Sequence, residues 1–136
     1  AGLDYPAEVV PIVYRLGQCL LRQRRVDDAD RELMSGLASL ELEHGPDKGA
    51  GGSMLRYRLL TELCHVRIAQ KRNELSLCER ALALAQRIFG PGHTRVAEEQ
   101  LRCATALCRQ AQYADAEGYL QQAYLIRQRS HGDRHP

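Results

Sequence analysis

Three glycine segments recur at nearly regular intervals along the 136-residue chain. They are centred on Gly45, Gly90 and Gly132, and each follows an apolar helical run with an aromatic residue or a histidine directly before the glycine. The two intervals are 45 and 42 residues. A fixed period of this size indicates an array of structural repeats, in which each unit buries its apolar face against its neighbours.

Six segments between these glycines have the apolar spacing of helices, and none alternates with a period of two, so we predict an all-α chain without strands. The expected helices span residues 7–24, 27–43, 53–71, 74–89, 94–111 and 113–130. Short polar side chains that accept first-turn amides give the expected N-caps: Asp27 or Asp28, Ser53, Asn73 and Thr94. Pro11 fits a first turn better than a helix interior. Glu98 and Glu99 would lie in the first turns of the fifth helix, where its dipole favours a carboxylate.

Small residues recur with the same spacing in the first and third helix pairs. They are separated by 12 and then 7 residues in both series: Gly17, Ala29 and Gly36, then Ala104, Ala116 and Ala123. Two helix backbones can cross closely only where the side chains are small, so we expect these residues to be buried at helix crossings. In the middle pair we expect Cys64 and Ala81 at the crossing. The connector before this pair would be five residues longer than the one before the third pair, and the turn between its helices two residues shorter than in the other pairs.

The pattern resembles the tetratricopeptide repeat, in the long 42-residue form found in kinesin light chains. The resemblance is strongest at the C-terminal end, in Cys103-Ala104, Gln110–Glu117, Ala123–Ile126 and Gly132–Pro136. It is partial in Leu16-Gly17 with Asp28–Asp30, and in Ala81–Leu84 with Gly90–His93. Glu74 departs from the pattern, because the family has alanine there.

The resemblance implies a right-handed α-solenoid of three antiparallel helix pairs, a superhelix like that of tetratricopeptide repeats. The whole chain, residues 1–136, would form a single array with repeats at about 6–46, 53–91 and 93–136. We expect the chain to be a fragment of a longer protein, because it stops where this family begins its next repeat. The sixth helix would then be uncapped, which predicts self-association through that helix.

Five cysteines at uneven spacing are a poor disulfide framework, and all five fall within expected helices. We expect free, buried thiols in the reducing cytoplasm. No two cysteines have the spacing of a zinc site. Cys64 and His65 are adjacent on a helix, so their side chains point about 100° apart. We therefore expect no catalytic residue, no metal site and no cofactor.

The net charge of +2 is too small to imply a nucleic acid or a membrane surface as partner. Arginines are spread through all six helices among acidic residues, and no apolar run reaches the length of about 18 residues needed to span a membrane. We expect neither nucleic acid nor membrane as partner. An RNA-binding helical repeat remains an alternative, and it would bind RNA less tightly as salt rises.

The leading hypothesis is a non-catalytic scaffold that binds a protein or peptide on its concave face, with a cargo or adaptor role as in kinesin light chains. By the resemblance, the groove residues lie on the first helix of each pair: Tyr14, Gln18 and Arg22; Thr61, His65 and Ile68; Leu101, Thr105 and Arg109. Arg22 and Arg109 would favour an acidic or carboxylate-bearing peptide. The alternative is a regulatory or substrate-recruiting segment of a larger enzyme or signalling protein.

Overall fold

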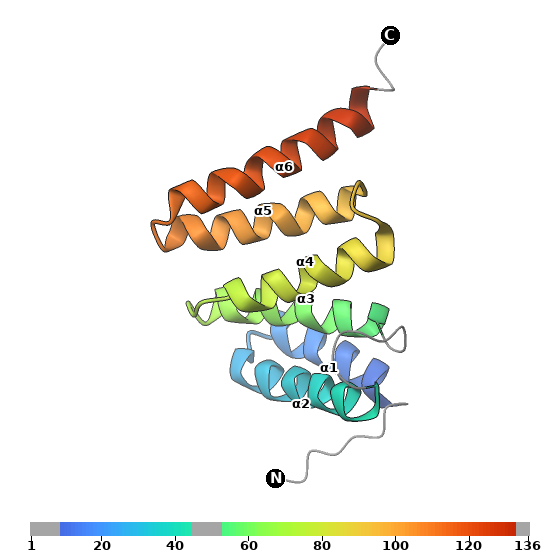
Figure 1. Ribbon diagram of the computed structural model, residues 1–136. Helices are drawn as coiled ribbons and strands as arrows, with labels where there is room; N and C mark the ends of the chain where they lie inside the picture. The colour runs from blue at the N-terminus through green and yellow to red at the C-terminus, as the bar shows by residue number, and fades with distance from the viewer. Residues whose placement is uncertain (1–8, 45–52, 133–136) are drawn as a thin grey trace. The chain divides into compact units, whose positions relative to one another are not determined.

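The computed structural model describes residues 9–44 and 53–132. Within these ranges it contains six helices and no strand, so the predicted all-helical class is confirmed there. The helices are α1 (Val10–Arg22), α2 (Val26–His44), α3 (Ser53–Ala69), α4 (Leu75–Phe89), α5 (Thr94–Arg109) and α6 (Tyr113–Gly132) (Figure 1). The chain divides into two compact units, Ala1–Leu77 and Cys78–Pro136.

The same turn ends the first helix of every pair. It places one residue in the left-handed region: Arg24 at φ 62°, Lys71 at φ 58° and Ala111 at φ 60°. The amide of the next residue then donates to a carbonyl five residues back: Arg25 to Leu20 at 2.9 Å, Arg72 to Arg67 at 2.8 Å and Gln112 to Leu107 at 2.9 Å. This is the Schellman arrangement, which satisfies carbonyls at a helix end. Each left-handed residue comes seven positions after Gly17, Cys64 or Ala104, so the register expected for these three helices agrees with the turns.

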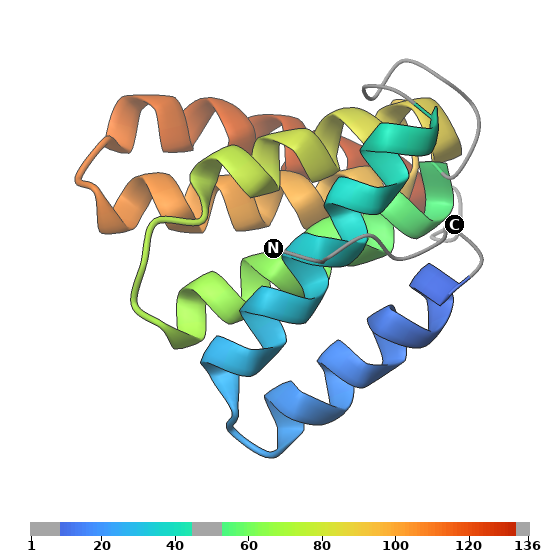
Figure 2. The ribbon, with the colours of Figure 1, turned by 90° about the horizontal axis from the view of Figure 1, so that it is seen from below.

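In the first unit, α1 and α2 pack side by side as an antiparallel pair (Figure 2). A Cβ atom on Gly17 would lie 2.5 Å from Cδ2 of Leu33, so a larger residue would force the Leu33 side chain or the two helices to shift. Ala29 on α2 is fully buried, and α2 also packs against α3. The expected close crossing of the first pair is confirmed.

In the second unit, α5 and α6 form the other antiparallel pair (Figures 1 and 2). Ala104, Ala116 and Ala123 are at most 2% exposed, as expected for the crossing. The repeated spacing of small residues therefore identified the buried positions of both pairs.

The middle repeat differs from the expectation. Helix α4 begins four residues after Lys71, whereas α2 and α6 begin two residues after Arg24 and Ala111, so this turn is longer by two residues and not shorter. The residues equivalent to Ala29 and Gly36 are then Cys78 and Ala85, and not Ala81. The helix itself is shorter instead: α4 has 15 residues, whereas α2 has 19 and α6 has 20. Cys78, Ala81 and Ala85 are all buried, so a search for small residues alone could not choose between the two registers.

The start of the first helix and the N-cap of the second differ from the expectation. Helix α1 begins at Val10, later than residue 7, with Pro11 in its first turn as expected. Helix α2 begins at Val26, so Asp27 and Asp28 lie in its first turn instead of capping it. There Asp28 pairs with Arg25 at 3.0 Å.

The expected cap of α4 is confirmed, and the expected cap of α5 is wrong. Oδ1 of Asn73 accepts the Leu75 amide at 2.9 Å, as expected. The N-cap of α5 is His93 and not Thr94: its Nδ1 accepts the Arg95 amide at 3.0 Å. The His93 ring stacks on Phe89 with 4.9 Å between centroids, which holds the imidazole in place to cap the helix. The expected cap by Ser53 and the connector at 45–52 lie outside the described side chains.

Candidate functional site

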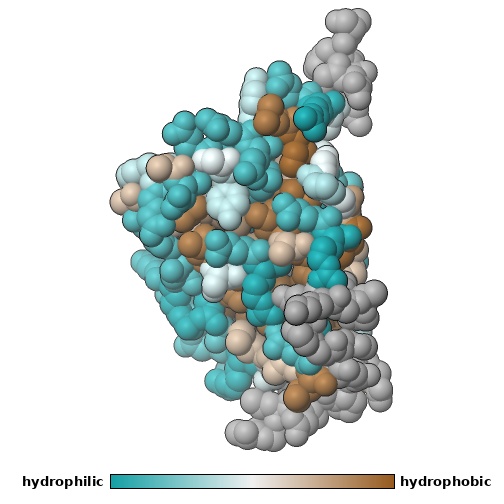
Figure 3. Space-filling model, viewed as in Figure 1, coloured by the Kyte–Doolittle hydropathy of each residue, from teal (hydrophilic) through white to brown (hydrophobic). Residues whose placement is uncertain are grey.

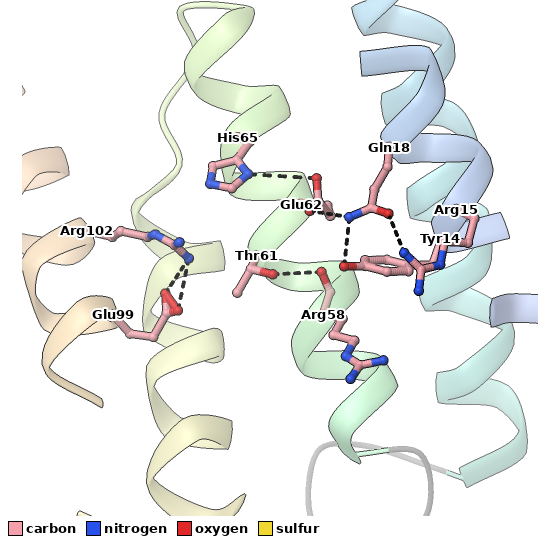
Figure 4. Close-up of polar contacts among 9 residues, drawn as sticks. All are labelled: Tyr14, Arg15, Gln18, Arg58, Thr61, Glu62, His65, Glu99 and Arg102. Carbon is pink, nitrogen blue, oxygen red and sulfur yellow. Dashed lines mark hydrogen bonds and ion pairs between the residues drawn. The ribbon is translucent and has the colours of Figure 1, made fainter. Parts of the chain in front are cut away.

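A polar cluster joins the exposed sides of α1 and α3 in the first unit (Figure 4). Nε2 of Gln18 donates to the Tyr14 hydroxyl at 3.0 Å and to Oε1 of Glu62 at 3.1 Å. Oε2 of Glu62 lies 3.8 Å from Nδ1 of His65, an ion pair when the imidazole is protonated. We call these four residues, Tyr14, Gln18, Glu62 and His65, the α1–α3 polar cluster.

Helical spacing orients the members of this cluster, and an adjacent arginine contacts two of them. Tyr14 and Gln18 are four residues apart on α1, and Glu62 and His65 are three apart on α3, so each pair shares a helix face. The Arg15 guanidinium lies 5.7 Å from the Tyr14 ring centroid, and its Nη1 donates to Oε1 of Gln18 at 3.3 Å. The Gln18 amide therefore uses both its oxygen and its nitrogen, which fixes its orientation.

The α1–α3 polar cluster keeps hydrogen-bonding capacity for a ligand. The Tyr14 hydroxyl accepts from Gln18 and can still donate its own proton. The Glu62 side chain is 14% exposed and the His65 side chain 44%, so water reaches both. A surface that offers donors and acceptors from two helices can bind the amides and carbonyls of a peptide.

The nine residues expected to face a partner are all partly or fully exposed. Of these, Tyr14, Gln18 and His65 are brought together through Glu62. On α5, in the second unit, Leu101, Thr105 and Arg109 follow one helix face at intervals of four and are exposed. The hydroxyls of Thr61 and Thr105 donate to the carbonyls of Arg58 at 2.8 Å and Leu101 at 2.9 Å, so only their lone pairs remain available. The remaining two of the nine, Arg22 and Ile68, are exposed.

Sequence reasoning missed Glu62 and Arg15, the two residues that tie the cluster together. Glu62 lies three residues before His65 on an expected helix, and this spacing could have identified the pair. The bond from Gln18 to Glu62 joins residues 44 positions apart, and no local signal indicates it.

The cysteines are free thiols in two environments. Cys64, Cys78 and Cys103 are buried, whereas Cys19 and Cys108 are exposed, so the expectation of buried thiols holds for three of the five. Cys64 is buried and His65 is exposed, so these neighbours point apart as expected. No three His, Cys, Asp or Glu side chains within residues 9–44 and 53–132 gather into a group that could hold a metal ion.

Cys103 is held in its protonated form. A side-chain hydrogen bond with Cys78, burial, and the nearby carboxylates of Glu79 and Glu99 raise the pKa of the Cys103 thiol far above its usual range. Because the thiolate and not the thiol is the nucleophile, Cys103 is chemically inert at neutral pH.

Alkylation should distinguish these two environments. In the native protein at neutral pH, iodoacetamide should modify Cys19 and Cys108 rapidly, because only these thiols are exposed. In denaturant without reductant, all five thiols should react. Mass spectrometry of time points measures both counts. Fast native modification of Cys103 would contradict its burial, and fewer than five modified residues in denaturant would indicate a disulfide.

The geometry defines a helical repeat protein whose first helices present polar side chains. Residues 104–136 match the family model of the tetratricopeptide repeat, so the similarity to this family covers the C-terminal part of the chain. Repeats of this family generally mediate protein–protein interactions and are typically not catalytic. None of the curated proteins compared with the chain matches it. In the described part of the chain, every helix is too short or too polar to cross a membrane.

Proposed function

We propose that this chain is a non-catalytic scaffold that binds a peptide or partner segment through the first helices of its repeats. The family match supports a protein-binding role of this general kind. The finer role of a cargo adaptor, as in kinesin light chains, and the alternative of a recruiting segment within a larger enzyme both use the same binding surface.

The observation that carries this proposal is the α1–α3 polar cluster. Its side chains are held by bonds within and between the two helices, so a ligand need not order them on binding (Figure 4). Preorganisation of this kind lowers the entropic cost of association. Scattered surface side chains would not be linked across two helices in this way.

In each unit, an arginine on a first helix suits the exposed face of that helix to an acidic peptide. Arg22 lies one helical turn beyond Gln18 on α1, and Arg109 continues the face of Leu101 and Thr105 on α5. Guanidinium groups bind carboxylates through charge-assisted, often bidentate, hydrogen bonds. The five free thiols favour a reducing compartment such as the cytoplasm for this function.

A displayed library of random peptides tests the proposal, because it requires no identified partner. Peptides enriched on the wild-type chain should be rich in Asp and Glu. Gln18→Ala should weaken their binding about tenfold, because one lost hydrogen bond and its unsatisfied partner cost about 1.4 kcal/mol. Arg22→Glu and Arg109→Glu should each weaken binding of the acidic peptides further. Fluorescence anisotropy gives the dissociation constants.

The matched control is Gln86→Ala, the same substitution at an exposed position of α4. Its dissociation constants should equal those of the wild type. If Gln18→Ala and Gln86→Ala weaken peptide binding equally, the peptide does not bind at the α1–α3 polar cluster. Unchanged binding by both arginine variants would remove Arg22 and Arg109 from the site.

A further inference from the structure

Helix α6 exposes several large apolar side chains, and Figure 3 shows hydrophobic surface among the polar residues of the molecule. Leu120 is 42% exposed, Tyr124 64% and Leu125 51%. Together with Glu117 and Gln121 they line a depression of about 500 Å³. We call these five residues the α6 face.

The first unit contains an equivalent surface that is covered in part, because the residues equivalent to Gln121 and Leu125, Met34 and Ala38, are exposed there. Each position of α2 corresponds to the position 87 residues later in α6. Glu117, Leu120 and Tyr124 therefore correspond, in this order, to Asp30, Leu33 and Leu37 of α2. There α3 packs on α2, and Leu37 is 2% exposed. Leu33 is fully buried and also packs against α1 at Gly17. Asp30 faces two basic residues near the end of α3: Arg67 at 3.7 Å and Arg72 at 4.0 Å. The α6 face therefore suits an apolar helix with arginine at its C-terminal end.

Helix α1 and the turn after it have the apolar side and one of the two basic residues, since Leu20 stands where α3 has Arg67. Ile12 is 67% exposed, Leu16 is 42% exposed and Cys19 is exposed, and their spacing of four and three places them on one side of the helix, the α1 face. Arg25 occupies the same position in the turn after α1 as Arg72 does after α3.

The equivalent side of α5 is covered. Shifting by the same 87 residues relates Ile12, Leu16 and Cys19 to Glu99, Cys103 and Ala106. These three residues are at most 1% exposed, and the Cys103 thiol forms a hydrogen bond with the Cys78 thiol on the preceding helix. The α1 face is thus the side on which a preceding helix packs.

We propose that the chain associates with a second copy of itself head to tail, with the α1 face of one copy on the α6 face of the next. A second copy is the occupant that the chain itself specifies, because it carries both apolar faces and complementary charges. Glu117 of one copy would meet Arg25 of the next, as Asp30 meets Arg72 within the first unit. Arg25 already binds Asp28, and its guanidinium has further donors. Such a contact is heterologous, so it leaves one free face at each end and permits further growth.

Two variants separate this arrangement from other modes of association. Leu16→Asp blocks the α1 face, and Tyr124→Asp blocks the α6 face. Both side chains are substantially exposed, so the fold should persist, and circular dichroism checks this. Sedimentation velocity over a hundredfold range of concentration should show the wild type growing beyond a dimer. Each variant alone should remain monomeric, and an equal mixture should form a dimer that does not grow.

The control is Leu42→Asp, which changes a leucine that is 80% exposed on α2 and outside both faces. It should associate like the wild type. A wild type that is monomeric at every concentration overturns the proposal. If Leu16→Asp still forms dimers and Tyr124→Asp does not, two α6 faces pair with each other and the head-to-tail arrangement is wrong. A mixture that stays monomeric also overturns it.

Discussion

Replacing Gly17 with valine should lower the free energy of unfolding by about 3 kcal/mol, near the upper end of the usual cost of overpacking a core. A Cβ at this position would lie 2.5 Å from Cδ2 and 2.6 Å from Cγ of Leu33. Leu33 is fully buried, so its side chain cannot swing into solvent. Either the leucine leaves its rotamer or α1 and α2 separate. Urea denaturation followed by circular dichroism measures the loss.

The same substitution at Gly118 is the matched control. Gly118 lies within α6, and a Cβ there would meet nothing within 4 Å. Because valine has a somewhat higher helix propensity than glycine, Gly118→Val should change the stability by less than about 0.5 kcal/mol. Equal losses at both positions would show that the effect comes from the valine itself and not from the crossing of α1 and α2.

The fold was predictable where one physical requirement acts on short stretches of sequence. Close helix crossings need small side chains, so the repeated spacing that begins at Gly17 and at Ala104 marked buried positions. The turns at Arg24, Lys71 and Ala111 carry no glycine signal. They form because the Schellman hydrogen bonds and the packing of the two helices outweigh the strain of a left-handed residue.

The prediction failed where several residues satisfied the same requirement. In α4, Cys78, Ala81 and Ala85 are all small and all buried. The register depends on the turn after Lys71, where Asn73 correctly indicated the cap of α4 but the spacing of small residues favoured a shorter turn. The cap of α5 was misassigned for a different reason: the His93 ring both caps the helix and stacks on Phe89, an arrangement that cap preferences do not include.

The candidate site was predictable only in part. The resemblance placed Tyr14, Gln18 and His65 on one side of the first helices, and all three are accessible in the structure. Glu62, which links them, was not anticipated, because its contact with Gln18 depends on how α1 and α3 pack. Local spacing identifies the face of a helix, and tertiary packing decides which faces meet.

Glu99 is a case in which a local interpretation was wrong. As one of two acidic residues near the start of α5, it was expected to act through the helix dipole. The first turn of α5 contains no acidic residue, and Glu99 is 1% exposed. Its two oxygens accept from Nη1 of Arg102 at 2.7 and 3.0 Å (Figure 4). The carboxylate is therefore part of the interior, and the arginine compensates its charge.

Removing the arginine alone should therefore destabilise the protein strongly. Arg102→Met takes this guanidinium away from the buried Glu99 carboxylate, and breaking a buried ion pair on one side costs about 3–5 kcal/mol. The Arg102 side chain is 32% exposed, so water can reach part of the site and the loss should fall near the lower end, about 3 kcal/mol. Thermal and urea denaturation of the variant give the value.

The double variant Glu99→Met/Arg102→Met separates the cost of the buried charge from the loss of arginine packing. With both charged groups replaced by apolar side chains of similar length, most of the stability should return, because burying an ion pair costs nearly as much as its attraction returns. Arg129→Met, at an exposed position of α6, controls for loss of a surface arginine and should be close to neutral. A single variant as stable as the wild type would show that Glu99 does not depend on Arg102. A double variant no more stable than Arg102→Met would show that the arginine stabilises α5 through its packing and not by compensating the buried carboxylate.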